Sequence, residues 1–300
     1  MRSKQIKRKM GIGRRKFFVG HFRKRQMKEY FFRASVVAAI ILIIIGVWGL
    51  ARPGVRVRAD AETVAAFRVP HRAIAILQNY ATRNGISFAE LFAVFSAENE
   101  FFPEKHVAYD LSVIERFYVS DFNNLRKRYN SRSISPYIRM YESLFSEIEI
   151  FPVYEEETSV MFGDTWGVEM NFQGNKTHKG TAIIDRENIR GRVSVVSMTK
   201  GKVREAGWDN NLGYYVGIVT ENNTYYLYAH LDSISQGIAA GQNVTAGTQL
   251  GKMGNSGGGR NGRSFPVHLH IAISPDVSFV RGEFWINPYP LLRFIHDTDN

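Results

Sequence analysis

An uninterrupted apolar stretch lies near the start of the chain. Residues Val36–Ala51 read VVAAIILIIIGVWGLA and are uncharged and almost wholly apolar. As a helix with a rise of about 1.5 Å per residue this segment is roughly 24 Å long, and Phe31, Phe32 and Arg33 extend it at a membrane interface. A buried core helix is the alternative, but such a helix usually keeps a polar side. We therefore predict a transmembrane helix over residues 35–52.

Between residues 61 and 150 the apolar positions recur every three or four residues, which predicts helices. The stretches AETVAAFRVPHRAIAILQNYATRNG, SFAELFAVFSAEN and ISPYIRMYESLFSEIEIF show this spacing. Gly85 is suited to the end of one helix, and Ser87 with Glu90 makes a capping box for the start of the next. We expect a small all-helical domain over 61–150, preceded by a short linker at 53–60.

After residue 155 the pattern changes to short runs of β-branched and aromatic residues between glycines and turn residues. Such runs predict strands, and Asn222-Asn223 between two of them indicates a hairpin. The runs are RVSVVSM, GKVREAGW, YYVGIVT, TYYLYAHL, QNVTAGTQLGKMG and VHLHIAIS. We expect an antiparallel all-β domain over residues 155–295. The fold class is therefore mixed, with one transmembrane helix, a small all-α domain and a C-terminal β domain.

The net charge of +11 is concentrated at the N-terminus. Residues 1–34 contain thirteen Lys and Arg and a single acid, Glu29, whereas the rest of the chain contains 26 basic and 27 acidic side chains. This distribution disfavours a nucleic-acid-binding globular domain, which would carry positive charge on its own surface. By the positive-inside rule, residues 1–34 are a cytoplasmic tail and the domains after residue 52 are extracytoplasmic.

A cleaved signal peptide is the competing interpretation of the N-terminal segment. Ala59 and Ala61 provide an Ala-x-Ala cleavage pattern, but a basic region of about 35 residues is too long for a signal peptide. We therefore expect an uncleaved single-pass anchor in the cell membrane. The chain has no cysteine, so no disulfide supports the outer domains, as in many exported bacterial proteins.

Four of the eight histidines fall in the predicted β domain, in positions that suit a metal site. His268 and His270 are two residues apart on a predicted strand, so their side chains point to the same face. One of them can bind a metal ion while the other reaches the water bound to that ion. His178 precedes a predicted strand and His230 ends another. A single histidine on a strand is more often packed or exposed, so the argument depends on all four together.

Four separated elements of the C-terminal half occur in a definite order and spacing. They are FGDTWGVE with THKGTAII (162–184), YAHLDS (228–233), AAGQNVTAGTQLGKMGNSG (239–257) and VHLHIAI (267–273). Together they resemble the LytM/lysostaphin-type zinc metallopeptidases, family M23. The resemblance implies that His178 and His270 are zinc ligands, and that His230 and His268 activate the water and stabilise the tetrahedral intermediate. It also implies Zn2+ as the cofactor and peptidoglycan peptide as the substrate.

One residue departs from that family's pattern. The family has an Asp four residues after the first histidine, and here that position is Ala182, whose methyl group cannot coordinate zinc. Asp185 lies three residues further along an extended strand, about 10 Å away and on the opposite face, and Glu187 is further still. Loss of an anionic ligand weakens zinc binding, so we expect hydrolysis to be impaired or absent.

Two functions follow from this pattern. The first is a membrane-anchored cell-wall endopeptidase that is impaired by the missing ligand. The second is a catalytically inactive scaffold or regulator that binds peptidoglycan, or a protein partner through its helical domain or tail, in wall remodelling, division or sporulation. The three intact downstream histidines favour the first function, and Ala182 favours the second. An introduced Asp-to-Ala substitution would give the same sequence.

Two other stretches contain further candidates. Glu98 in SFAELFAVFSAENEFFPEK resembles the catalytic acid of lytic transglycosylases, but no second catalytic feature accompanies it, and a solvent-facing acid is the simpler interpretation. The glycine-rich loop 254–266 lacks the Lys-Ser/Thr ending of a P-loop. We interpret it as the rim of a substrate groove, where Arg260 or Arg263 meets an acidic peptide.

Overall fold

The part of the chain that can be described begins after the predicted membrane segment. The structure is a computed structural model, and it describes residues 58–69, 73–97, 122–154, 160–170, 176–258, 265–277 and 283–298. The predicted tail, the transmembrane segment at 35–52 and the candidates Glu98, Arg260 and Arg263 lie outside these ranges. Within the ranges, no helix combines the length and the apolar character needed to cross a bilayer.

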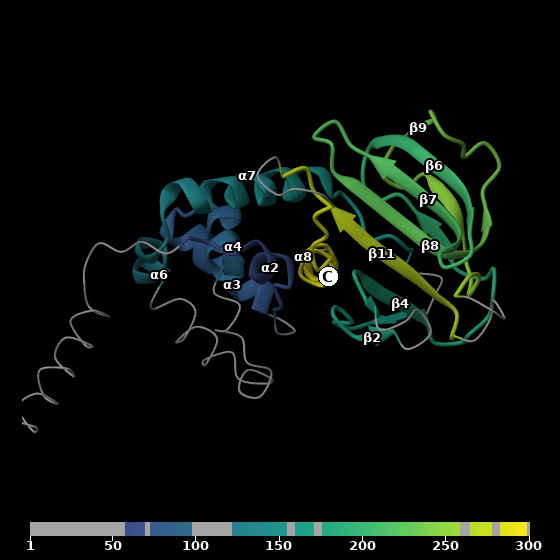
Figure 1. The fold of residues 1–300 in the computed structure, drawn as a ribbon, viewed down its shortest axis with the longest axis horizontal. Helices are drawn as coiled ribbons and strands as arrows, with labels where there is room; N and C mark the ends of the chain where they lie inside the picture. Colours follow the sequence, from purple (N-terminus) through teal and green to yellow (C-terminus); the bar gives the residue numbers. More distant parts are fainter. Residues whose placement is uncertain are drawn as a thin grey trace, which may run out of the picture. The chain divides into compact units, whose positions relative to one another are not determined.

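Helices make up the first described part of the chain (Figure 1), as the spacing of apolar residues predicts. They are α2 (Ala61–Ala65), α3 (Ala73–Asn84), α4 (Phe88–Ala97), α6 (Phe122–Arg128) and α7 (Ser131–Glu147). Gly85 follows α3 with a φ of +61°, and the backbone N–H of Glu90 donates to Ser87 Oγ at 3.4 Å. These contacts confirm the predicted end of α3 and half of the predicted capping box.

The strands form an antiparallel sheet in the neighbour order β1-β4-β11-β8-β7-β6-β9, while β10 pairs with β8 and β5, and β2 pairs with β3. The antiparallel β domain is thereby confirmed. The predicted hairpin at Asn222-Asn223 joins β7 to β8, and Asn223 has a φ of +60°. The strands are β1 (Val160–Phe162), β2 (Glu169–Met170), β3 (Lys176–Thr177), β4 (Thr181–Asp185), β5 (Ser194–Val196), β6 (Gly201–Asp209), β7 (Gly213–Val219), β8 (Tyr225–Ile234), β9 (Asn243–Val244), β10 (Gln249–Met253) and β11 (His268–Ser274).

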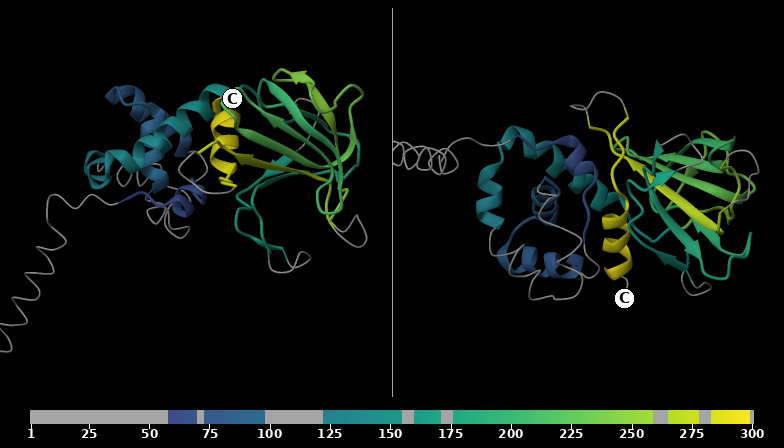
Figure 2. Two further views of the ribbon diagram at one scale, coloured as in Figure 1. Left: turned by 45° about the horizontal axis from the view of Figure 1, so that its top comes forward. Right: turned by 60° about the horizontal axis from the view of Figure 1, so that its bottom comes forward.

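Residues Tyr289–Thr298 form a helix, α8, although the residue pattern predicts only strands up to residue 295. Phe294 on α8 packs against Phe88 and Phe145, with ring centroids 5.6 and 4.6 Å apart. The helix lies between the other helices and the sheet (Figure 2). The expectation of an all-β C-terminal domain is wrong here, because a short amphipathic segment gains its helical structure from tertiary packing more than from its own pattern. Its buried side chains include Leu291, Leu292 and Ile295.

The two faces of the sheet differ in burial. On β11, which lies between β4 and β8 (Figure 1), the side chains of His268 and His270 are partly exposed and alternate with fully buried Leu269 and Ile271. The same alternation makes Ala182 on β4 partly exposed, because it is paired directly with His270. We call the face that carries His268, His270 and Ala182 the site face; the opposite face packs into the hydrophobic core.

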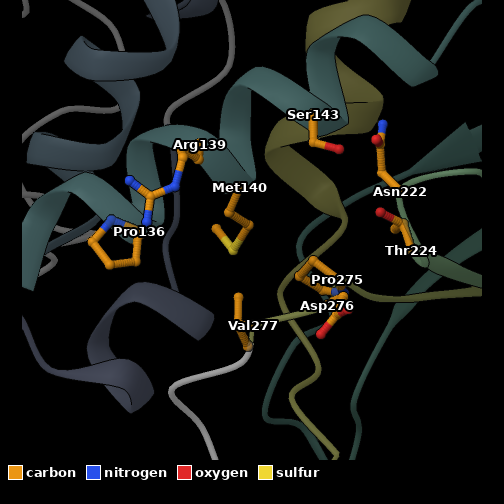
Figure 3. A pocket seen from close by; sticks show the side chains of 9 residues that line it. All are labelled: Pro136, Arg139, Met140, Ser143, Asn222, Thr224, Pro275, Asp276 and Val277. Carbon is orange, nitrogen blue, oxygen red and sulfur yellow. The ribbon is translucent and has the colours of Figure 1, made fainter.

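The C-terminal end of α7 is joined to the sheet through the carboxylate of Glu147. Its Oε1 accepts hydrogen bonds from Thr220 Oγ1 at 2.9 Å and Ser143 Oγ at 3.1 Å, and its Oε2 accepts one from the Tyr226 hydroxyl at 3.3 Å. A cavity of about 140 Å³ lies between α7, the β7–β8 turn and the residues after β11. Figure 3 shows the side chains that line it. The helices and the sheet are therefore packed together within one compact unit, Arg56–Asn300.

We expect Glu147→Ala to lower the free energy of unfolding by about 2 kcal/mol, because the buried Tyr226 hydroxyl and two other hydroxyls lose their acceptor. Urea denaturation of the two proteins measures this difference. Glu142→Ala is the matched control, since Glu142 is exposed on the same helix, and it should change stability by less than about 0.5 kcal/mol. Equal effects of the two substitutions would contradict the role assigned to Glu147.

Candidate active site

The structure brings together the four histidines that the sequence singles out. His178 lies in the connection between β3 and β4, His230 on β8, and His268 and His270 on β11. The ring centroids of His178 and His270 are 4.7 Å apart, as are those of His230 and His268, and those of His230 and His270 are 5.9 Å apart. The four imidazoles therefore form one cluster on the site face.

Backbone carbonyls orient three of the four rings. Because a carbonyl oxygen only accepts hydrogen bonds, the Nδ1 atom facing it carries the proton, and the Nε2 atom of the same ring keeps a lone pair. In each of these three rings Nε2 is therefore the hydrogen-bond acceptor, and it is not the atom that contacts the carbonyl. The Nδ1-to-oxygen contacts are His178 to Thr165 at 3.0 Å, His230 to Ser256 at 2.8 Å and His268 to Pro266 at 2.8 Å.

The fourth ring is oriented by another histidine. His178 Nε2 and His270 Nδ1 are 2.7 Å apart, and since Nε2 has the lone pair, His270 Nδ1–H is the donor. These two nitrogens are the ones that would converge on a metal ion held at this point. A Cβ at Gly180 would lie 2.4 Å from His270 Cε1 and 2.5 Å from the Ile271 carbonyl oxygen, so glycine is required for this close approach.

Partial burial lowers the pKa of all four imidazoles and so favours their neutral forms. It is the first cause that lowers the pKa of His178, His268 and His270, with a further lowering of the pKa of His268 and His270 by neighbouring histidines. For His230, burial and then the neighbouring His268 lower the pKa to about 4. Neutral imidazoles accept protons and coordinate metals, and both abilities need the lone pair that a charged ring lacks.

His230 occupies its place through an irregularity of the strand. Its φ is +62°, which is unusual for a residue other than glycine and costs about 1–3 kcal/mol. The pairing of β7 with β8 shifts register between Tyr214 and Val216, opposite this residue, and the His230 N–H donates to the Leu212 carbonyl at 2.8 Å. A β-bulge of this kind changes the direction of a side chain, here toward the other histidines.

The acids that follow His178 point elsewhere. Asp185 is only 1% exposed; its carboxylate is bonded to Arg192 and accepts the backbone N–H of Ile189 at 3.0 Å and of Glu187 at 3.3 Å. Glu187 itself pairs with Arg192 at 3.3 Å. As the alternation along β4 predicts, Asp185 therefore lies on the face opposite Ala182 and His270.

The donor set consequently does not fit a catalytic zinc ion with three protein ligands. Two imidazole nitrogens converge, but the residue paired with His270 on the neighbouring strand is Ala182. Among the described residues, no group of three or more His, Cys, Asp or Glu side chains is arranged to hold a metal ion.

Comparison with known proteins identifies the fold that carries this cluster. The sequence model of Peptidase family M23 matches residues 176–281, which contain all four histidines. The C-terminal domain is an M23 domain. The family resemblance found in the sequence is thus confirmed.

Two proteins similar to this chain support the M23 assignment. The L-Ala–D-Glu endopeptidase of Bacillus subtilis (strain 168) is 33% identical over 178 residues, which are 57% of this chain and 52% of that protein. The chain therefore spans about half the length of this curated relative. A crystal structure from Ruminococcus gnavus ATCC 29149, described as a glycyl-glycine endopeptidase LytM, is 29% identical with a TM-score of 0.58, over 83% of this chain and 94% of that one.

Residues that the sequence did not single out also shape the M23 site. Thr165 contributes its carbonyl to His178, and its Oγ1 accepts the Ala182 N–H at 3.1 Å. The Phe265 ring centroid is 5.8 Å from those of His230 and His268. Thr165 lies in the motif FGDTWGVE. Every residue has a backbone carbonyl, so the residue type does not reveal that this carbonyl contacts His178.

The loop that carries Thr165 is held by residues far away in the chain. Asn287 Nδ2 donates to the Phe67 carbonyl at 3.1 Å and to the Asp164 carboxylate at 3.2 Å. Asp164 also pairs with Arg68 at 3.5 Å, and Arg68 donates to the Trp166 carbonyl at 2.9 Å. The residues after α2 and before α8 therefore support the loop that positions His178.

Proposed function

We propose that this M23 domain binds peptidoglycan peptide at the four histidines and that its zinc-dependent endopeptidase activity is lost or strongly reduced. One observation carries the proposal: the residue paired with His270 is Ala182, whose side chain has no atom that can bind a metal. The family resemblance implies that this is the position of the carboxylate ligand. The names of the two similar proteins, an L-Ala–D-Glu endopeptidase and a glycyl-glycine endopeptidase, support a peptide as the ligand.

The groups that remain are suited to holding a peptide. The Nε2 atoms of His230 and His268 have lone pairs, because their Nδ1 atoms donate to backbone carbonyls. They can therefore accept N–H groups of a bound peptide. A catalytic zinc ion would supply an activated water, but with His178 and His270 as donors and no carboxylate at residue 182, zinc should be held too weakly for efficient hydrolysis.

The location is part of the same proposal. The apolar segment 35–52 and the basic residues 1–34 support a single-pass anchor with the tail in the cytoplasm and the M23 domain facing the cell wall. In that place the chain acts chiefly as a peptidoglycan-binding scaffold. Asp185 and Glu187 both pair with Arg192, so neither is placed to replace the missing zinc ligand. This favours a binding role over that of an enzyme with a rearranged ligand set.

The test uses the full-length chain in detergent. After dialysis against zinc-containing and then zinc-free buffer, we expect less than one zinc ion per chain, sedimentation of the chain with purified peptidoglycan sacculi, and no release of soluble peptide. A chain that retains one tightly held zinc ion and cleaves cross-linked peptide would contradict the loss of activity. A chain that does not sediment with sacculi would contradict the binding role.

A further inference from the structure

The site face continues beyond the histidines into a surface lined by aromatic side chains. Leu227, Ala229 and Ala272 form a small buried apolar cluster there. The pairing of β11 with β8 places this cluster next to the imidazoles, because His270 is paired with Ala229 and Ala272 with Leu227. The partly buried side chains that pack on it are Leu212, Tyr215, Tyr225 and Trp285.

A carboxylate lies among these rings. Glu205 on β6 accepts the Tyr225 hydroxyl at 2.7 Å and the Tyr215 hydroxyl at 3.5 Å. Burial, followed by the hydrogen bond to Glu205, raises the pKa of Tyr225 far above its usual value, so its hydroxyl stays protonated and donates. A carboxylate has about four lone-pair positions, so Glu205 can accept further hydrogen bonds from a ligand.

A guanidinium lies against the same tyrosine ring. The pairing of β6 with β7 shifts register between Val203 and Glu205, which makes Arg204 an extra residue in the strand. The Arg204 Cζ lies 5.3 Å from the centroid of the Tyr225 ring. The exposed Arg204 and the partly exposed Glu205 therefore both border Tyr225, which also makes an edge contact with Trp285 at 6.0 Å.

The close packing of this surface depends on a glycine. Gly217 is paired with Glu205, and a Cβ there would lie 2.2 Å from the Tyr225 hydroxyl oxygen. The missing side chain lets Tyr225 reach across β7 to the carboxylate. The arrangement of opposite charges and aromatic rings is thus built into three adjacent strands.

We propose that Arg204, Glu205, Tyr215, Tyr225 and Trp285 form a subsite for a zwitterionic amino-acid head, with its ammonium and carboxylate on one carbon. A ligand with the ammonium alone would be repelled by Arg204, and one with the carboxylate alone by Glu205; a zwitterion satisfies both. The aromatic rings add cation–π attraction for the ammonium. In a peptide, such a head occurs at the free end of a diamino dicarboxylic acid such as diaminopimelate.

The distance between this subsite and the histidines suits one peptide that reaches both. Tyr225 is four residues along β8 from Ala229, which is paired with His270, so the separation is roughly 13 Å. An extended chain of about four residues covers that length. The inference rests on the proposed function, because the same peptide must lie at the histidines.

Binding of two synthetic peptides to the full-length chain tests the subsite. The probes are L-Ala-D-Glu-X-D-Ala with X either diaminopimelate or lysine, which lacks the second carboxylate, and calorimetry measures both affinities. We expect the diaminopimelate peptide to bind about tenfold more tightly, as one charge-assisted contact would give. Arg204→Gln should abolish this preference, and Glu205→Gln should weaken both peptides by a similar factor.

We expect both variants to keep the fold, and thermal melting checks this. The side chain introduced by Glu205→Gln still offers an amide oxygen to the two tyrosine hydroxyls. Lys200→Gln and Glu221→Gln are the matched controls, since Lys200 and Glu221 are an exposed ion pair of the same β domain, and neither should change affinity. Equal affinity of the unchanged protein for both peptides, or a preference that survives Arg204→Gln, would overturn the subsite alone. Failure to bind either peptide would overturn the proposed function as well.

Discussion

Replacing Ala182 by Asp is expected to turn the M23 domain into an efficient zinc endopeptidase. Residue 182 is paired directly with His270 on the site face, and opposite residues of antiparallel strands have Cβ atoms about 4.5–5.5 Å apart. A carboxylate at residue 182 would therefore join the two converging nitrogens of His178 and His270. We expect peptide release from sacculi to rise by more than about a hundredfold, since even changes outside the ligand shell alter metal sites by about 10- to 100-fold.

Two measurements on the full-length chain check this expectation. Metal analysis after dialysis should rise to one zinc ion per chain for Ala182→Asp, and soluble peptide should appear from purified sacculi. Ala182→Asn is the matched control, because it has the same size as Asp without the charge. Adding His178→Ala to Ala182→Asp should remove both gains. An Asp variant that holds no more zinc than the parent chain would show that the geometry at residue 182 does not support coordination.

Asp185→Asn is expected to cause the largest loss of stability, about 3–5 kcal/mol. The side chain of Asp185 is buried and bonded to Arg192, which is itself 21% exposed. Asn at residue 185 carries no charge for Arg192 and turns an NH2 donor toward N–H groups that Asp185 accepts, and this loss of acceptors is the main cost, although Arg192 keeps its pair with Glu187. Urea denaturation measures the change. Asp232→Asn is the control, since Asp232 pairs with Arg190 at a more exposed position and should change stability by about 0–1 kcal/mol.

The same pair predicts a pH dependence. Burial alone would raise the pKa of Asp185, but hydrogen bonds from Arg192 and from the backbone N–H groups of Ile189 and Glu187 outweigh it and lower the pKa below 3.8. A lowered pKa in the folded state gives stability that is complete above the unfolded value and is lost as pH falls through the folded value. Below pH 3.8 the unchanged protein should therefore lose this contribution, and Asp185→Asn should not. Parallel pH profiles of the two proteins would contradict this assignment.

The sequence predicted those features of the site that depend on strand alternation. His268 and His270 share a face, and Asp185 lies on the face opposite Ala182, because side chains alternate along β11 and β4. The positive φ of His230 was not predicted, since a single histidine does not mark the position of a bulge within a strand. The contact from Thr165 was also missed, because it is made by a carbonyl that every residue has.

The same reasoning separates the correct and incorrect parts of the fold prediction. Strands β7, β8 and β11 are rich in β-branched and aromatic residues, and their positions were predicted closely. The helix α8 was missed because its ten residues are helical through their packing against Phe88 and Phe145. Asn287 supports the Thr165 loop through its hydrogen bond to Asp164, which lies 123 positions earlier in the chain. Local sequence patterns do not reveal a contact between residues so far apart.

The carbonyl contacts of His178, His230 and His268 have a consequence for how the site tolerates mutation. A main-chain oxygen is present whatever side chain its residue carries, so the orientation of these rings does not depend on the side chains of the residues that supply the oxygens. Genetic drift at Thr165, Ser256 or Pro266 need not disorder the imidazoles. Since an alanine codon is a single base change from an acidic codon, one mutation at residue 182 would place a carboxylate opposite His270 while the rest of the cluster stays in place.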